Sequence, residues 1–316
     1  FPNFILNGIV EDVSNHIDTS DPFWDYLDTN PLKYQGVTYN CYVGTKNNGM
    51  TYFNTKMFKN AGLETPYELY KSGKWDWNAF RTLAKNMTYD SDNDGIFDHV
   101  GFRAWSLRAL MVSNNTWPLV KKDGKVALNL DSSEMRAMYQ LVYDMANVDK
   151  SLGSGDETEG FEKIASGHVT MYLERPLRIV NIINAGAKAE DIEIAPVPKG
   201  DAASDYLSFY SPVTSAISSS CKNKEAALAL IECYMSVQNK MTETGPRECY
   251  GYNYTEQQQE VIEFVRNRES VEIVPTGYGQ IHSYLNAIYE EIKDGSTVAA
   301  AIELYKNKMN NDISLG

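Results

Sequence analysis

One segment of the chain, Tyr89–Phe102, carries acidic residues at alternate positions around a glycine. In EF-hand-like loops, side-chain and carbonyl oxygens at positions 1, 3, 5, 7 and 9 wrap around a hard cation such as Ca²⁺. The segment offers an oxygen donor at each of these positions, so a structural calcium ion remote from any substrate is expected here. The expected ligands are Asp90, Asp92, Asp94, the carbonyl of Ile96, and Asp98.

The same spacing has a second interpretation, which the sequence leaves open. Position 12 of the loop is Gly101, where an EF-hand has a bidentate glutamate. Aspartate and asparagine side chains also bond their own backbone in turns, and Gly95 can supply the positive φ of such a turn. The segment is therefore either a calcium loop or an ion-free turn, and the sequence requires no other cofactor.

The sequence contains none of the motifs of nucleophilic, metal-dependent or nucleotide-dependent catalysis. There is no G-x-S-x-G, G-x-G-x-x-G, Walker loop or H-E-x-x-H. With 42 acidic residues, pairs of carboxylates arise by chance, so a glycosidase dyad cannot be judged by counting. We therefore expect a protein without enzyme activity. The histidines are few and widely spaced: His16, His99, His168 and His282.

Composition limits the partners of the chain. Its 316 residues predict about two domains, and an apolar fraction of 43% supplies real cores. A net charge of −13 argues against nucleic acid and against anionic lipid, both of which need a basic surface. No apolar run approaches the ~20 residues of a membrane-spanning helix. The four cysteines are interpreted as small buried residues, with a disulfide at Cys249 as the alternative.

Alternating helical and strand patterns predict an α/β fold with mixed sheets. Apolar residues at the helical period follow Trp77, and further helices are expected after caps at Asp131, Asn223, Thr255 and Ser296, with another over Ile281–Ile292. A polar surface loop is expected over Ser151–Gly160. The expected strands are Thr51–Phe53, Val126–Leu128, Val169–Leu173, Ile192–Pro196 and Ser215–Ile217.

Several short motifs follow one another along nearly the whole chain. They are Gly8–Val13, Tyr34–Tyr39, Tyr52–Asn54, Trp77, Asn115–Leu119, Phe161–Met171, Ala195–Gly200 and Ala216–Ser218. In this order they resemble the motifs of the extracellular solute-binding proteins, family 1, of bacterial ABC importers, the family of the maltose-binding proteins. Each motif is weak alone, and their order makes the resemblance specific.

The resemblance implies a periplasmic-binding-protein-like fold of type II, with two lobes of mixed sheets flanked by helices. Residues 1–49 plus 211–254 would form the first lobe, and residues 50–210 plus 255–316 the second. The chain would cross between the lobes near residues 41–49, 210–215 and 251–255. Because Phe1 aligns after the opening strands of the family, the first lobe is expected to be incomplete.

The resemblance also implies a solute site between the lobes. Sugars stack on aromatic rings, each face adding roughly 1 kcal/mol for about 50 Å² covered, and their hydroxyls need polar partners. Glu174, Arg175 and Ser211 are expected to bind hydroxyls. The expected aromatic contacts are Tyr42, Trp105, Trp117, Tyr172, Tyr210, Tyr278 and Tyr284.

The function implied is the binding component of an ABC importer that presents a carbohydrate, expected to be an oligosaccharide, to a membrane permease. A monomer is expected outside the cell membrane, as a lipoprotein of the cell surface or in the periplasm. Two alternatives stay open. One is a secreted carbohydrate-active enzyme, and the other is a receptor of the same fold for a solute that is not a sugar.

Overall fold

The structure is a computed structural model of the 316-residue chain. It describes residues 2–18, 21, 36–39, 42–43, 49–104, 108–153, 157–174, 178–210, 214–243, 248–249, 252–266, 269–271 and 280–315.

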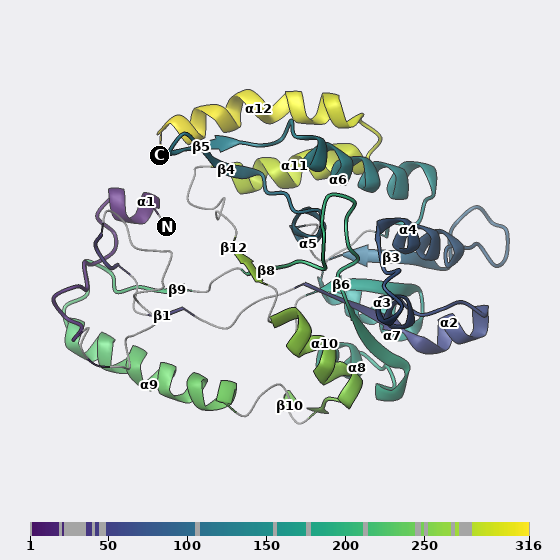
Figure 1. Ribbon diagram of the computed structural model, residues 1–316, viewed down its shortest axis with the longest axis horizontal. Helices are drawn as coiled ribbons and strands as arrows, with labels where there is room; N and C mark the ends of the chain where they lie inside the picture. Colours follow the sequence, from purple (N-terminus) through teal and green to yellow (C-terminus); the bar gives the residue numbers. More distant parts are fainter. Residues whose placement is uncertain are drawn as a thin grey trace.

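A four-stranded mixed sheet forms the centre of the larger part of the molecule (Figure 1). Its strand order is β3-β6-β2-β7, in which β3 is parallel to β6, and β2 is antiparallel to both β6 and β7. All residues of β2 and β6 are buried, as expected for strands covered on both faces. The strands are β2 (Met50–Asn54), β3 (Val100–Ala104), β6 (Val169–Glu174) and β7 (Ile192–Pro196).

Successive side chains of each strand enter two different cores, because side chains alternate across a sheet. Phe53 and Leu173 belong to the larger core, which also contains residues of α4, α5, α6, α11 and α12. Tyr52 and Tyr172 belong to the other core, together with residues of α7, α8 and α10. The result is a three-layer α/β/α arrangement, which confirms the predicted α/β fold with a mixed sheet flanked by helices.

The helix predicted after Trp77 is confirmed as α4 (Trp77–Asn86), capped by Asp76 through the amide of Ala79 at 2.8 Å. Trp75 and Trp77 are buried at its start, and the indole N–H of Trp75 donates to the carbonyl of Pro196 at 2.8 Å. This bond ties the helix to the end of β7.

The remaining elements of the described residues are further helices of these layers, several short strand pairs, and a smaller group that includes α1 and α9. The helices are α1 (Pro2–Leu6), α2 (Thr55–Ala61), α3 (Pro66–Lys71), α5 (Arg108–Ser113), α6 (Ser133–Tyr143), η2 (Asp144–Val148), α7 (Glu157–Ser166), α8 (Ile179–Asn184), η3 (Ala189–Asp191), α9 (Lys224–Glu243), α10 (Glu256–Arg266), α11 (Ile281–Lys293) and α12 (Val298–Leu315). The strands are β1 (Tyr42–Val43), β4 (Leu119–Lys122), β5 (Lys125–Leu128), β8 (Ser208–Tyr210), β9 (Thr214–Ser215), β10 (Glu248–Cys249), β11 (Tyr252–Asn253) and β12 (Glu269–Val271).

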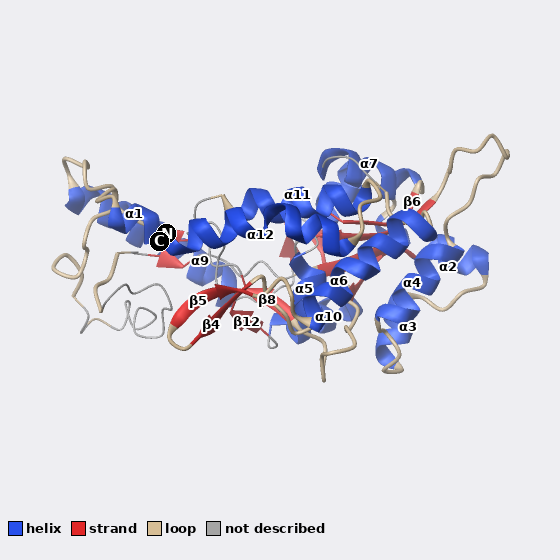
Figure 2. Ribbon diagram, turned by 90° about the horizontal axis from the view of Figure 1, so that it is seen from above, coloured by secondary structure: helices blue, strands red, loops and turns tan. Residues whose placement is uncertain are grey.

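A smaller group of elements lies apart from the central sheet. Figure 1 places α1, α9 and the antiparallel pair β1–β9 on the left and the sheet with its helices on the right, and Figure 2 shows the same separation from above. This group has a small core of its own. The division into lobes stays a prediction, and residues 41, 44–48, 211–213 and 251 of the expected crossings lie outside the described residues. The core residues are Val13, Ile17, Ile217, Leu228 and Met235.

Two predicted helix caps are confirmed. The side chain of Asn223 accepts from the amide of Ala226 at 3.0 Å at the start of α9. Thr255 and Gln258 form the predicted capping box before α10, with reciprocal bonds of 3.2 and 3.1 Å. Both caps join groups three residues apart, so the local sequence is sufficient to specify them.

Two other predicted caps are wrong. α6 is capped by Ser132 rather than by Asp131; the carboxylate of Asp131 instead pairs with Arg136 and Lys306, each at 2.5 Å. Likewise, α12 begins after Thr297 rather than Ser296. Ion pairing with a distant helix explains the first error, because the carboxylate is engaged by Lys306 of α12.

The polar loop predicted over Ser151–Gly160 is wrong in its second half, because α7 begins at Glu157. Gly160 lies inside this helix against the ring of Tyr172, so its missing side chain serves packing and not a turn. The sequence prediction also omits β3 and places the last predicted strand about one residue late, since β9 is Thr214–Ser215.

The interpretation of the cysteines as buried residues is wrong for the two that the structure describes. Cys221 is only half-buried, and Cys233 is exposed on α9; both are free thiols. Cys41 lies outside the described residues, and the side chain of Cys249 is not described.

Candidate functional site

The carboxyl ends of three parallel strands lie at one edge of the central sheet. β2 runs antiparallel to both β6 and β7, so β3, β6 and β7 all point the same way and end at Ala104, Glu174 and Pro196. Met50, the first residue of β2, pairs with both Glu174 and Pro196. In open α/β sheets, ligands bind outside the carboxyl ends of the strands. This edge is therefore the candidate solute site.

Two of the predicted site residues are brought together at this edge. Tyr172 and Glu174 stand two positions apart on β6 and therefore on the same face of the sheet. The hydroxyl of Tyr172 donates to Oε2 of Glu174 at 3.0 Å. Both residues are buried: Tyr172 has no exposed surface, and Glu174 is 2% exposed. A bond from a hydroxyl to a buried carboxylate is charge-assisted and fixes its orientation.

Helix α7 holds the ring of Tyr172 in place. Phe161 meets this ring edge-to-face at 5.8 Å between centroids. Gly160 lies so close that a Cβ atom there would stand 2.7 Å from both Cζ and the hydroxyl oxygen of Tyr172. The absence of a side chain at Gly160 therefore permits the position of Tyr172 and, through it, of Glu174.

Arg103 is a further polar residue at this edge that the sequence reasoning missed. It pairs in register with Tyr172, so it shares the α7 face of the sheet. Its guanidinium is almost fully buried, with Nη1 3.7 Å from Oε2 of Glu159 on α7. A signal was present in the sequence: an arginine standing between Phe102 and Trp105 in an otherwise apolar run. Buried charges of this kind are retained mostly when paired.

Several predicted residues lie outside the described part of the chain. Trp105, Arg175, Ser211 and Tyr278 are among them, and of Tyr42 and Tyr210 only the strand placement in β1 and β8 is described. Trp105 and Arg175 directly follow Ala104 and Glu174 at the candidate edge. Their roles in binding stay predictions.

The other two predicted aromatic residues, Trp117 and Tyr284, pack against the larger core. Trp117 is half-buried there. Tyr284 of α11 stacks on Tyr305 of α12 at 5.8 Å between centroids, with Lys308 over both rings. Their roles in binding a solute stay predictions.

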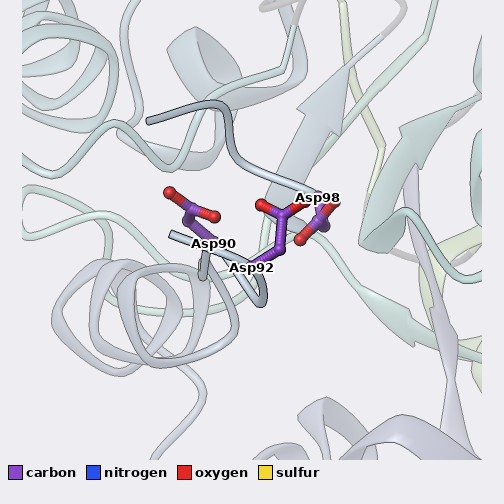
Figure 3. Close-up of side chains that lie close together, drawn as sticks. All are labelled: Asp90, Asp92 and Asp98. Carbon is purple, nitrogen blue, oxygen red and sulfur yellow. The ribbon is translucent and has the colours of Figure 1, made fainter. Parts of the chain in front are cut away.

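The acidic loop gathers three of the carboxylates that the sequence singles out. Oxygen atoms of Asp90, Asp92 and Asp98 lie within 4.8 Å of one another (Figure 3). Asp94 is not part of this group; its carboxylate accepts from the amide of Ile96 at 2.8 Å. Three of the five expected oxygen donors are thus grouped as a cation would require, and hard cations such as Ca²⁺ prefer this type of donor.

Hydrogen bonds within the loop also lower the pKa values of two of these carboxyls. The pKa of Asp90 lies below its usual value chiefly because the amide of Gly95 donates to it at 2.8 Å. The pKa of Asp98 is lowered mainly by the hydroxyl of Ser91. Both side chains are thus kept as carboxylates, with or without a cation, so the two interpretations of the loop remain open.

Comparison with known proteins assigns the family. A sequence profile of the bacterial extracellular solute-binding proteins matches residues 4–241, which is most of the chain. The chain belongs to this family. No curated protein sequence matches it significantly. The resemblance drawn from the motif order is thereby confirmed, and the family is one of binding proteins of the cell exterior.

Solved structures of solute-binding proteins share the fold of this family member. An ABC substrate-binding protein from Listeria monocytogenes in complex with cycloalternan has a TM-score of 0.77 at 17% identity, covering 99% of this chain and 82% of that one. The maltose/maltodextrin-binding domain from Bdellovibrio bacteriovorus, bound to maltotriose, has a TM-score of 0.71 at 17% identity with the same coverage. A protein from Mycobacterium tuberculosis in complex with glycerophosphocholine has 0.70 at 13% identity, covering 99% and 80%.

These similarities confirm the predicted type II binding-protein fold of the family member. Among the helices in the described ranges, none is both long and apolar enough to pass through a lipid bilayer.

Proposed function

We propose that this chain is the substrate-binding component of a bacterial ABC importer and that its solute is a carbohydrate, held without chemical change. The observation that carries the proposal is the Tyr172–Glu174 pair, which stands at the carboxyl edge of β3, β6 and β7 in a member of the solute-binding family. Sugar complexes among the structural neighbours support a carbohydrate as the solute.

The polar groups at this edge suit the hydroxyls of a sugar. A carboxylate accepts hydrogen bonds at both oxygens, and that of Glu174 is held by the Tyr172 hydroxyl before any solute arrives. Such preorganisation lowers the entropic cost of binding. Arg175 and Ser211 are proposed to add further polar contacts. The aromatic platforms are proposed to be Trp105, Trp117 and Tyr210, with contributions from Tyr42, Tyr278 and Tyr284.

Burial of Glu174 has a consequence for the mechanism. A side chain only 2% exposed can contact a solute only if neighbouring segments move. We propose that the chain divides into the two predicted lobes, residues 1–49 plus 211–254 and residues 50–210 plus 255–316. Rotation about the crossings near residues 41–49, 210–215 and 251–255 would open the edge to a solute and then enclose it.

A second candidate function is a receptor of the same fold for a solute other than a sugar. The complex with glycerophosphocholine among the structural neighbours favours it. Arg103 at the candidate edge would suit a solute with an anionic group, although its pairing with Glu159 neutralises part of its charge. Catalysis, the third possibility, predicts a chemically altered solute.

A thermal-shift screen of the full chain with mono- and oligosaccharides, polyamines, peptides and phosphodiesters separates these candidates. A ligand at about one hundred times its dissociation constant adds about 2.7 kcal/mol to the free energy of unfolding. The proposal expects shifts with carbohydrates only. A shift with glycerophosphocholine alone supports the second candidate, and a sugar product seen by chromatography after incubation supports an enzyme.

An isosteric variant then tests the site. Glu174→Gln keeps the size of the side chain but loses one strong acceptor, so the affinity for the sugar found in the screen should fall at least tenfold in calorimetry. Glu162→Gln, an exposed glutamate of α7, is the matched control and should bind as the wild type does. Equal affinity in both variants would remove Glu174 from the site.

The proposal carries further expectations about partners and location. The permease of an ABC importer would receive the solute from a monomeric binding protein, outside the cell membrane or in the periplasm, with or without a lipid anchor. The acidic loop is proposed to hold a structural Ca²⁺ on Asp90, Asp92 and Asp98, and no other cofactor is proposed.

A further inference from the structure

A hollow of about 540 Å³ lies at the end of the central sheet opposite the candidate solute edge. It is lined by residues that adjoin the other ends of the same four strands: Asn54 ends β2, His99 precedes β3, Gly167 comes shortly before β6, and Asp191 precedes β7. Strands of five or six residues separate the two ends by roughly 15 Å. The hollow is thus distinct from the proposed solute site.

A second hollow of about 580 Å³ continues the first around helix α2. Lys56 and Asp191 line both hollows, so the two form one groove that follows both flanks of α2. Helix α2 itself lies at the right of Figure 1. We call this the α2 groove. Each half falls within the range of about 300–1,000 Å³ that is common for small-molecule sites. An extended ligand could occupy both halves.

The α2 groove contains an aromatic ring fixed in place. Tyr89 is 42% exposed, and its ring stacks on His99 at 4.2 Å between centroids with an interplanar angle of 23°. His99 is in turn held through Nδ1, which lies 2.8 Å from the carbonyl oxygen of Gly167. Backbone bonds of 3.1 and 3.2 Å between Tyr89 and His99 keep the two residues in register. His99 thus supports the ring of Tyr89, and the exposed part of Tyr89 lines the groove.

Polar side chains that make no hydrogen bond with the described residues line the same hollow as this ring. Lys56, Asn60 and Asn86 are exposed and line the same half of the groove. Within the described part of the chain, none of these three side chains makes a hydrogen bond or an ion pair with another residue. Planar amides and an ammonium group beside an aromatic face match the hydroxyls and the apolar face of a sugar ring.

The charges of the α2 groove indicate the class of ligand. Two lysines, Lys56 and Lys59, stand among three carboxylates, so the lining is mixed in sign. The carboxylates are Glu68, Glu190 and Asp191. A strongly anionic or cationic ligand would meet like charges along part of its length, whereas a neutral polar chain would not.

We propose that the α2 groove is a second binding site and that it takes a neutral glycan chain, independently of the solute carried at the β3–β6–β7 edge. Tyr89 stacks on one sugar ring, Asn60 and Asn86 bind hydroxyls, and the half lined by Lys59 and Glu190 receives the continuation of the chain. Such a site would hold the protein on a glycan surface while the other site binds solute.

An array of immobilised neutral linear oligosaccharides of glucose, mannose, galactose, xylose and N-acetylglucosamine tests this site with the full-length protein. Tyr89→Ala removes the platform but leaves the backbone pairing with His99. Tyr234→Ala, on another exposed tyrosine that lies on α9, is the matched control. Asn86→Ala tests the amide, with Asn307→Ala on α12 as its control.

The proposal expects at least one glycan that the wild type and both controls bind, and that Tyr89→Ala and Asn86→Ala bind at least tenfold more weakly in calorimetry. Glu174→Gln should leave this binding unchanged, while Tyr89→Ala should leave binding at the other edge unchanged. Failure of the solute site therefore does not affect this test. Absence of any glycan whose binding depends on Tyr89 overturns the proposal, as does binding that Glu174→Gln abolishes.

Discussion

A methyl group added at Gly160 should disturb the candidate site through Tyr172, which it would contact. The new Cβ would lie 2.7 Å from Cζ and from the hydroxyl oxygen of Tyr172 and 3.0 Å from its Cε2, distances that side chains do not tolerate. The ring cannot move away freely, because it is fully buried and packs against Phe161. Relief of the clash must therefore shift Tyr172 or α7, and with either the bond to Glu174.

The magnitude follows from one stabilising and two destabilising contributions. Alanine in place of a glycine inside a helix stabilises it by about 1 kcal/mol. Overpacking of a well-filled core costs about 1–3 kcal/mol, and weakening a hydrogen bond to a charged group costs up to about 3 kcal/mol. Gly160→Ala is thus expected to lower the free energy of unfolding by about 2 kcal/mol, although helix propensity alone predicts a gain.

Urea denaturation measures this change, provided that the m-value stays constant. Gly153→Ala is the matched control: its Cβ would meet its nearest atoms at 3.5–3.9 Å, which are ordinary contacts, and it should be neutral or slightly stabilising. Affinity for the solute should fall in Gly160→Ala and not in Gly153→Ala. A Gly160→Ala variant as stable as the wild type, with unchanged affinity, would refute the role given to Tyr172.

Three further changes have defined outcomes. Burial raises the pKa of Glu193 to about 6 from 4.5, so the wild type should lose up to about 2 kcal/mol of stability as the pH rises from 4.5 to 6, and Glu193→Gln should not. Arg81→Met should cost about 2 kcal/mol in urea denaturation, because Arg81 pairs with Asp144 and with the buried Asp149, both at 2.5 Å. Addition of Ca²⁺ should raise the melting temperature of the wild type relative to a chelator, and Asp90→Asn should abolish this rise.

Each of these outcomes has a control and a contrary result. Glu263→Gln, exposed on α10, should keep the wild-type pH dependence, and a Glu193→Gln curve parallel to that of the wild type would contradict the burial argument. Lys71→Met breaks an exposed pair with Glu260 and should lower the free energy of unfolding clearly less than Arg81→Met does. An equal loss in the two variants would contradict the contribution assigned to the buried Asp149. A melting temperature that ignores Ca²⁺ would favour the ion-free turn.

The parts of the fold set by local patterns could be predicted from the sequence. The apolar period behind Trp77 was sufficient for α4, and the Thr255–Gln258 capping box for the start of α10. The order of short motifs identified the family and with it the type II fold. These signals act over a few residues, so they survive without knowledge of distant contacts.

Features set by contacts between distant segments could not be predicted. Asp131 looks like a cap in sequence but binds Lys306 of α12. Gly160 looks like a loop residue in the sequence. It is a glycine because the ring of Tyr172, which lies on another element, leaves no room for a side chain there. The α2 groove is assembled from residues of α2, α3, α4 and α7 and from residues next to the ends of four strands, so no single stretch of sequence carries its pattern. In the candidate site, the sequence identified Tyr172 and Glu174 as residues that bind the solute. It did not predict the hydrogen bond between them.

Hydrogen–deuterium exchange of the full-length protein, with and without a sugar found by thermal shift, tests the central claim most directly. If the solute binds at the carboxyl edge of β3, β6 and β7, amides at residues 103–104 and 172–174 should gain protection on binding, and amides around α9 far from the crossings should not. Protection confined to other segments, or a bound sugar that leaves this edge unchanged, would contradict the account.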